Sequence, residues 1–240
     1  MLRKRPLIIA HRGASRHERE NTIAAFQAGI DAGADGVEFD VRLAKDGTPV
    51  VIHDANLKRV AGVEASVAKS TPAELAGYRV PTFVDVLELF AGTRAAVHVE
   101  LKVDSRREIR PLVSAVIDVV RASPLLGQIV LSSFSLAAIS EAKLHLPDIS
   151  TSALFAPSIL QVLKRRRHMI SLARSFAADG ISPHRSLVTR KLVRLASSGG
   201  MPVTVWTCDK VKWVDRAADL GIAAVITNDP AKLVSYRADG

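Results

Sequence analysis

Short apolar runs alternate with amphipathic helical patterns along the whole sequence. Apolar residues recur at helical spacing in residues 21–32, 82–91, 107–121 and 189–197. The apolar runs between such segments are short enough to be strands. We expect eight strands, at residues 7–10, 36–43, 95–103, 129–133, 150–155, 180–182, 202–207 and 223–227. Eight strands joined by crossover helices predict an α/β fold, the parallel eight-stranded (β/α)8 or TIM barrel.

The alternation is interrupted after the second strand. Lys45-Asp46-Gly47 is a turn signal that reverses the chain into an antiparallel partner at residues 49–52. Residues 55–79 lack strong periodicity, so we expect a small loop-rich insertion over the mouth of the barrel. Since no linker is apparent and the chain has 240 residues, residues 1–240 are expected to form a single barrel domain.

Composition narrows the class of protein further. Hydrophobic residues make up 48% of the chain and aromatic residues only 5%, which predicts a core of Val, Ile, Leu and Ala. The single cysteine, Cys208, excludes an intrachain disulfide and a Cys-based zinc cluster, and it favours a reducing compartment. Residues 7–10 are too short an apolar run for a signal peptide, and no run reaches the roughly 18 residues of a membrane span. We expect a cytoplasmic protein without stable membrane insertion.

The net charge of +9 raises the question of anionic partners. The densest basic run, residues 164–168, has no interleaved aromatic residues that could stack on bases. A solvated helix face is therefore the favoured interpretation, and we expect no nucleic-acid partner. Nothing in the pattern indicates an oligomeric state.

Charged residues alternate with apolar ones in the second and third expected strands. The charged residues are Glu38, Asp40 and Arg42 in one strand and His98, Glu100 and Lys102 in the other. Side chains two residues apart share a face, so the apolar rows should meet the helices while the charged rows face the barrel interior. Because the two strands should be neighbours, Glu38, Asp40 and Glu100 are expected to converge near the strand ends, where barrel active sites lie.

Three converging acids predict a metal site. Carboxylate oxygens without a thiolate suit a hard divalent cation, Mg²⁺ or Ca²⁺, better than zinc. The alternative is a buried ion-pair network with Arg42, His98 and Lys102 and no metal. We favour the metal because dense charge networks are uncommon in barrel cores.

Two histidines stand at expected strand ends beside these acids. His11 follows residues 7–10 and His53 follows residues 49–52. Imidazoles exchange protons near neutral pH, so the two side chains could form an acid–base pair. Arg12 is suited to clamp a phosphate, and Gly13 would let the backbone approach the ligand closely.

Two further residues have both an ordinary and a functional interpretation. Asn21 is a good helix N-cap, and that role is expected to be its main one. Trp206 should point inward on the seventh strand. It would then provide an apolar wall at the barrel mouth, or else simply pack in the core.

These residues form part of an ordered set of motifs that resembles the glycerophosphodiester phosphodiesterase family. The match is densest over residues 7–54 and thin from about 140 to 200, and an ordered set of this length is far more specific than any single motif. The motifs are His11-Arg12-Gly13, Glu20-Asn21-Thr22, Ala25-Phe26, Gly33-Ala34-Asp35, Glu38-Phe39-Asp40-Val41, Lys45-Asp46-Gly47, Val50-Val51-Ile52-His53-Asp54, Pro81-Thr82, Val99-Glu100-Leu101-Lys102, Ser132-Ser133-Phe134, Val205-Trp206-Thr207 and Ile226-Thr227-Asn228-Asp229-Pro230.

The resemblance implies a (β/α)8 barrel that hydrolyses glycerophosphodiesters to glycerol 3-phosphate and an alcohol. It implies that Glu38, Asp40 and Glu100 hold the divalent ion and that His11 and His53 are the acid–base pair. It further implies that Arg12 and Lys102 contact the phosphate or other polar groups of a small-molecule substrate.

The sequence departs from the family pattern at a few positions outside these sites. Ala44 replaces the usual Thr, Cys208-Asp209 replaces the common Val-Asn, and the insertion at 55–79 is shorter than usual. These differences bear on the choice of substrate. The alternatives are a lysophospholipase D-like activity, another specialised phosphodiester, or a barrel that binds phosphodiesters without cleaving them.

Overall fold

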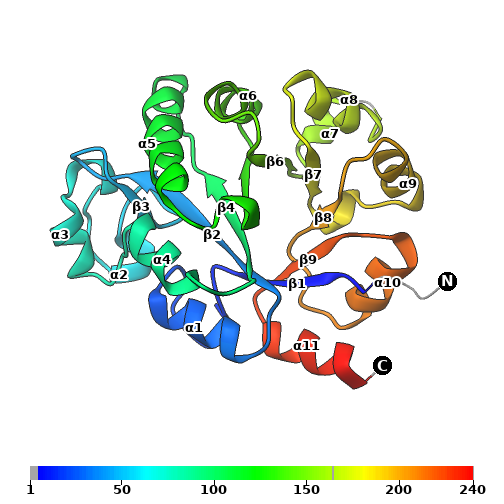
Figure 1. The fold of residues 1–240 in the computed structure, drawn as a ribbon, viewed down its shortest axis with the longest axis horizontal. Helices are drawn as coiled ribbons and strands as arrows, with labels where there is room; N and C mark the ends of the chain where they lie inside the picture. Colours follow the sequence, from blue (N-terminus) through cyan, green and yellow to red (C-terminus); the bar gives the residue numbers. More distant parts are fainter. Residues whose placement is uncertain (1–4, 164, 240) are drawn as a thin grey trace.

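The protein forms a barrel of parallel strands surrounded by helices, as a computed structural model that describes residues 5–163 and 165–239 shows (Figure 1). The parallel strands are β1 (Leu7–His11), β2 (Gly36–Leu43), β4 (Ala96–Leu101), β5 (Ile129–Ser133), β6 (Ser150–Phe155), β7 (Gly180–Pro183), β8 (Thr204–Val205) and β9 (Ala224–Thr227). They are hydrogen-bonded in the order β7-β6-β5-β4-β2-β1-β9-β8. Single bridges between Ile181 and Val203 and between His184 and Trp206 join the two ends of this order. The barrel is nearly closed, which confirms the predicted (β/α)8 fold.

Helices follow the strands and cover the outside of the barrel. They are α1 (Ile23–Asp31), α4 (Phe83–Phe90), α5 (Ile109–Ala122), α6 (Leu136–His145), α7 (Ile159–Val162), α8 (His168–Ser175), α9 (Arg190–Ser198), α10 (Lys212–Leu220) and α11 (Pro230–Asp239). The four helices expected from apolar spacing agree with α1, α4, α5 and α9 to within two residues at each end. Threonine side chains cap α1, α4 and α9 by accepting a hydrogen bond from the backbone N–H three residues later.

The expected hairpin is present beside the barrel. Strand β3 (Pro49–Val51) pairs antiparallel with the end of β2. The insertion that follows consists of loops and short helices: α2 (Lys58–Ala61), η1 (Val67–Lys69) and α3 (Pro72–Ala76). Its buried side chains, including Leu57, Val67 and Leu75, pack in a small core with Val50 and Ile52 of the hairpin. This core holds the insertion to the end of β2.

The main core lies between the barrel strands and the helices. It is built mostly from Val, Ile, Leu and Ala, as predicted. Aromatic rings are few but concentrated next to β2, where Phe39 packs against Phe26 at 5.4 Å and Phe83 at 5.9 Å between ring centroids. This packing determines how the middle of β2 lies on the helices.

Two strands are shorter than predicted by at least three residues. The expected strand 95–103 is β4 (Ala96–Leu101), and the expected strand 202–207 is only β8 (Thr204–Val205). β8 has a continuous ladder only with β9, and the residues beside it meet the β7 side through single bridges. Fewer residues of this segment are therefore paired as a strand. Among the described helices, none has the length and apolar character needed to cross a membrane.

Candidate active site

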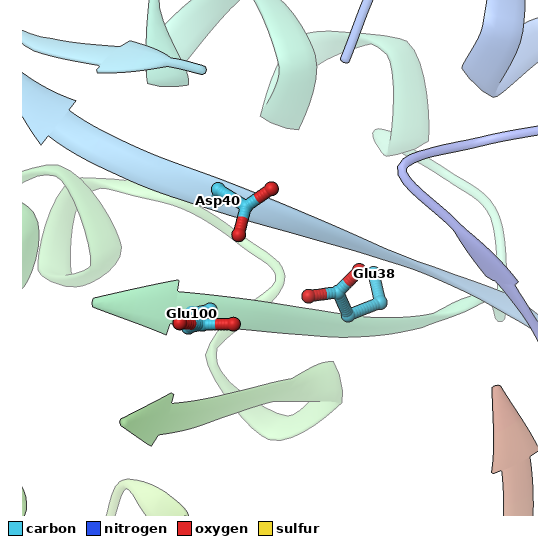
Figure 2. A group of neighbouring side chains, drawn as sticks. All are labelled: Glu38, Asp40 and Glu100. Carbon is cyan, nitrogen blue, oxygen red and sulfur yellow. The ribbon is translucent and has the colours of Figure 1, made fainter. Parts of the chain in front are cut away.

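The three predicted acids meet at the barrel interior. Asp40 on β2 lies opposite Glu100 on β4 in the strand register, and Glu38 lies one pleat earlier on β2. Carboxylate oxygens of the three side chains lie within 4.8 Å of one another, and all three residues are buried. Figure 2 shows the carboxylates pointing toward one another between the two strands. The predicted convergence is confirmed.

Burial works against the simultaneous ionisation of these acids. Burial and the charge of Asp40 raise the pKa of Glu38 to about 8 and that of Glu100 to about 7. Burial opposes the ionisation of Asp40 as well, but the charges of Arg12 and Lys102 outweigh it and hold the pKa of that carboxyl below its usual range. When all three carboxylates are ionised, the cluster therefore carries negative charge that is not fully balanced.

Two cations contact the cluster without neutralising it fully. Nε of Arg12 lies 3.0 Å from Oδ2 of Asp40. Nζ of Lys102 lies 2.8 Å from Oε1 of Glu100 and 3.6 Å from Oδ1 of Asp40. Arg42 does not take part, because its guanidinium bonds to Asp104 and to a backbone carbonyl instead. The alternative ion-pair network with Arg42, His98 and Lys102 is therefore wrong for Arg42, whereas Lys102 does contact the acids.

The ring of His11 is held by the far end of the chain. Its Nδ1 lies 2.6 Å from Oδ1 of Asn228, and its Nε2 lies 3.8 Å from Oε2 of Glu38. The amide of Asn228 is itself oriented, because its Nδ2 donates to Asp209 at 3.0 Å. With Oδ1 left as the acceptor, the Nδ1 of His11 carries the proton and Nε2 faces the acids. Burial, followed by the charge of Arg12, lowers the pKa of His11.

The second histidine has a carboxylate partner. Nδ1 of His53 lies 2.6 Å from Oδ1 of Asp54. Burial raises the pKa of Asp54, but its hydrogen bonds from Arg59 and His53 more than compensate and lower it to about 2, so Asp54 is ionised. An ionised partner orients the imidazole and stabilises its protonated form. Burial nevertheless lowers the pKa of His53 itself.

A cavity of about 290 Å³ is lined by all of the predicted site residues except Asp40, which is fully buried. One part of its wall is polar and the other apolar. The polar part includes His11, Arg12, Glu38, His53, Glu100 and Lys102. The apolar part includes Phe134, Leu154, Trp206 and Ile226. The ring of Trp206 meets that of Phe134 edge-on at 5.7 Å, and its Nε1 donates to the carbonyl of Ser182. The expected inward position of Trp206 is confirmed.

One sequence interpretation is corrected, and a second residue has a further role. Asn21 is not the N-cap of α1, since Thr22 caps that helix; the side chain of Asn21 instead donates to Oδ2 of Asp40 at 3.0 Å. Gly13, which was expected to let the backbone approach a ligand, is also required by packing, because a Cβ there would lie 2.4 Å from the carbonyl carbon of Ala25. Its positive φ of 81° also favours glycine.

Several supporting residues were not predicted. Asp209 and Asn228 hold His11, and Glu20 accepts a hydrogen bond from Arg12 at 3.0 Å. Glu20 and Asn228 lie within motifs of the resemblance, so that signal was available for them. Asp209 had none, because it stands at a position where the sequence departs from the family pattern.

The acidic cluster has the chemistry of a cation site. Oε2 of Glu38 and Oδ1 of Asp40 are buried and have no hydrogen-bond partner among the described residues. Burying a carboxylate oxygen that receives no hydrogen bond costs free energy, unless a cation coordinates that oxygen. The donor set therefore fits a divalent cation.

This barrel carries acids, imidazoles and cationic side chains at the carboxyl ends of its strands, which is where the active sites of (β/α)8 barrel enzymes lie. The model of the glycerophosphoryl diester phosphodiesterase family matches residues 11–232, and the chain belongs to this family.

Known proteins agree with the family assignment over nearly full length. A glycerophosphodiester phosphodiesterase of Caldanaerobacter subterraneus subsp. tengcongensis is 30% identical, with 95% of this chain and 96% of that protein covered. A lysophospholipase D of Rattus norvegicus is 28% identical over 95% of this chain and 85% of its own length. The structure of an Oleispira antarctica phosphodiesterase in complex with the product sn-glycerol-3-phosphate superimposes with a TM-score of 0.84, at 25% identity and with 98% and 97% of the two chains covered.

Proposed function

We propose that the protein hydrolyses glycerophosphodiesters to sn-glycerol 3-phosphate and an alcohol, with Mg²⁺ or Ca²⁺ as cofactor. The observation that carries this proposal is the shared cavity, in which Glu38 and Glu100, with the buried Asp40 close to both, lie together with two imidazoles and two cationic side chains. The product bound to the Oleispira antarctica phosphodiesterase supports the same class of substrate.

Glu38, Asp40 and Glu100 would hold the cation. All-oxygen ligation favours Mg²⁺ or Ca²⁺ over softer metals. When bound, the cation neutralises phosphate charge and acts as a Lewis acid.

Arg12 and Lys102 would bind the phosphate beside the acids. The Lys102 ammonium has three N–H groups and contacts carboxylate oxygens of Glu100 and Asp40, which leaves a donor for a phosphate oxygen. The guanidinium of Arg12 is anchored by Glu20 and Asp40 on one side and borders the cavity on the other. Both cations would stabilise the negative charge that develops on the phosphoryl oxygens.

The two histidines would carry the protons. One imidazole takes a proton from the nucleophile while the other donates a proton to the leaving alkoxide. The nucleophile is water, or else the glycerol 2-hydroxyl, which would first form a cyclic phosphate that water then opens. The contacts of His11 with Asn228 and of His53 with Asp54 would orient the two rings for this exchange.

A lysophospholipase D-like activity is the second candidate. Phe134 is 46% exposed and packs on Trp206, so the cavity has an apolar wall that could accept an acyl chain. The similarity to the rat protein that is named a lysophospholipase D also supports this candidate. This activity would use the same acids and histidines.

A substrate panel separates these possibilities. Glycerophosphoethanolamine and glycerophosphocholine would be compared with lysophosphatidylcholine, each with Mg²⁺, with Ca²⁺ and with EDTA. We expect release of sn-glycerol 3-phosphate from the first two, abolished by EDTA and by Glu100→Gln. Faster release of lysophosphatidate would favour the second candidate. Binding of all three diesters without turnover under either metal would show a non-catalytic barrel and contradict the proposal.

A further inference from the structure

Arg59 connects two parts of the candidate site that are separate in the sequence. It lies on the short helix α2 of the insertion. Its Nε donates to Oδ2 of Asp54 at 2.6 Å, while Nη1 and Nη2 donate to the two carboxylate oxygens of Glu20, each at 2.8 Å. The two-pronged contact with Glu20 fixes the plane of the guanidinium as well as its position.

Each acid that Arg59 contacts continues to a residue of the cavity. Asp54 holds Nδ1 of His53 at 2.6 Å. Glu20 accepts from Nη1 of Arg12 at 3.0 Å, and Arg12 in turn contacts Asp40. A continuous chain of charged contacts therefore runs from His53 through Arg59 to Arg12. A shift of the Arg59 guanidinium would therefore weaken the support of His53 and that of Arg12 at the same time.

We propose that Arg59 is a positioning residue that holds His53 and Arg12 in the mutual arrangement needed for phosphodiester cleavage. The proposal rests on the proposed function, in which these two side chains act on the substrate. Arg59 does not line the cavity that contains the predicted acids and histidines, so it would act through the acids to which it donates and not on the phosphate itself. Only an arginine can satisfy both acids from one rigid group; a lysine is a point charge and can meet one well.

The contacts of Arg59 should matter more for activity than for folding. Its side chain is 48% exposed, and ion pairs so close to solvent contribute little to global stability. A small displacement of catalytic groups, by contrast, can reduce turnover by as much as about 10²-fold. This difference gives the proposal a clear experimental signature.

The first experiment compares Arg59→Ala and Arg59→Lys with Lys58→Ala as a matched control. Lys58 is the preceding residue of α2 and pairs with Glu64, with both side chains at least 70% exposed. We expect Arg59→Ala to lower kcat by about 10- to 100-fold with little change in KM and an unchanged melting temperature. Arg59→Lys should fall between Arg59→Ala and the unaltered protein, and Lys58→Ala should match the unaltered protein. A normal kcat in Arg59→Ala, or a rise in KM alone, would overturn the proposal.

A double-mutant cycle tests the route of the effect. If Arg59 acts through His53 and Arg12, Arg59→Ala should cost much less kcat when Asp54 and Glu20 are already replaced by Ala than when they are intact. If Arg59→Ala lowers kcat by the same factor whether or not Asp54 and Glu20 are present, the proposal is overturned. The effect of Arg59 would then not pass through these two acids. Failure of the proposed function has a different result: the unaltered protein itself would not cleave glycerophosphodiesters.

Discussion

At the level of single residues, the two histidines of the cavity differ in what holds their rings. His11 faces the neutral amide of Asn228, whereas His53 faces the ionised carboxylate of Asp54. A carboxylate stabilises an imidazolium, and an amide does so less. The two rings are therefore in unequal environments, and the proposed roles of one acid and one base call for such a difference.

Replacing either histidine tests their assignment. We expect His11→Ala and His53→Ala each to lower kcat by a factor on the order of 10² or more, because proton transfer at the reacting oxygens is lost. Steady-state release of sn-glycerol 3-phosphate is the measurement. His145→Ala is a suitable control, since this exposed histidine pairs with Glu141 on α6, away from the cavity. Near-normal turnover in both cavity variants would show that the acid–base assignment is wrong.

At the level of elements, alternation was the most informative signal in the sequence. It placed Glu38 and Asp40 on one face of β2 and Glu100 on the same face of β4, and the observed register puts Asp40 opposite Glu100. This was predictable because period-two patterning and the adjacency of successive parallel strands are local properties.

Other features of the site could not be predicted in this way. His11 and Asn228 are 217 residues apart and meet only because β1 pairs with β9 when the barrel closes. Arg59 lies in a segment without periodicity, so nothing local indicated where its side chain would point. The expectation that Asn21 is the N-cap of α1 rested on residue preference alone. Thr is a good N-cap as well, and only the backbone conformation shows that Thr22 and not Asn21 has this role.

The packing of β2 gives a prediction at this level. Phe39 lies between the two acids in sequence, and its fully buried ring packs on Phe26 and Phe83. We expect Phe39→Ala to lower the free energy of unfolding by about 3–5 kcal/mol, because it removes a large buried side chain and leaves a cavity. It should also lower kcat, since β2 loses the contact that holds Glu38 and Asp40 in place.

Urea unfolding followed by circular dichroism measures the stability change. Phe39→Leu is the matched control, since it retains most of the buried volume and should cost much less. If Phe39→Ala lowers the free energy of unfolding by less than about 1 kcal/mol, the space left by the ring is filled by its neighbours without penalty, and other contacts hold β2.

At the level of the whole molecule, the barrel combines a buried acidic cluster with supporting residues from distant parts of the chain. The acids come from β2 and β4, the histidines from β1 and from the end of the hairpin, and the apolar wall includes Phe134 beyond β5 and Trp206 beyond β8. Folding therefore assembles the site at a cost, because three carboxylates are buried together. A bound cation would offset that cost, so cation binding and global stability should be linked.

The linkage has a definite dependence on pH. The pKa of Glu38 is raised to about 8 and that of Glu100 to about 7 in the folded protein, largely by burial, whereas both lie near 4.5 as ordinary groups. The folded chain therefore binds more protons than the unfolded chain between these values. The stability contributed by these two groups is fully present below about pH 4.5 and is lost as the pH rises through 7 and 8. The depressed pKa of Asp40 acts in the opposite direction, but only at acidic pH.

A divalent cation should consequently stabilise the protein more at high pH than at low pH. At about pH 6 the cation must displace protons from Glu38 and Glu100, whereas above pH 8 both carboxylates are already ionised and repel one another without it. We expect the increase in melting temperature caused by Mg²⁺ or Ca²⁺, relative to EDTA, to be larger at about pH 8.5 than at about pH 6. Glu100→Gln should diminish the increase at the higher pH, because it removes one charged ligand, while Lys58→Ala should leave it unchanged. Equal increases at the two pH values would contradict the protonation of these acids, and no increase at either would contradict cation binding by the cluster.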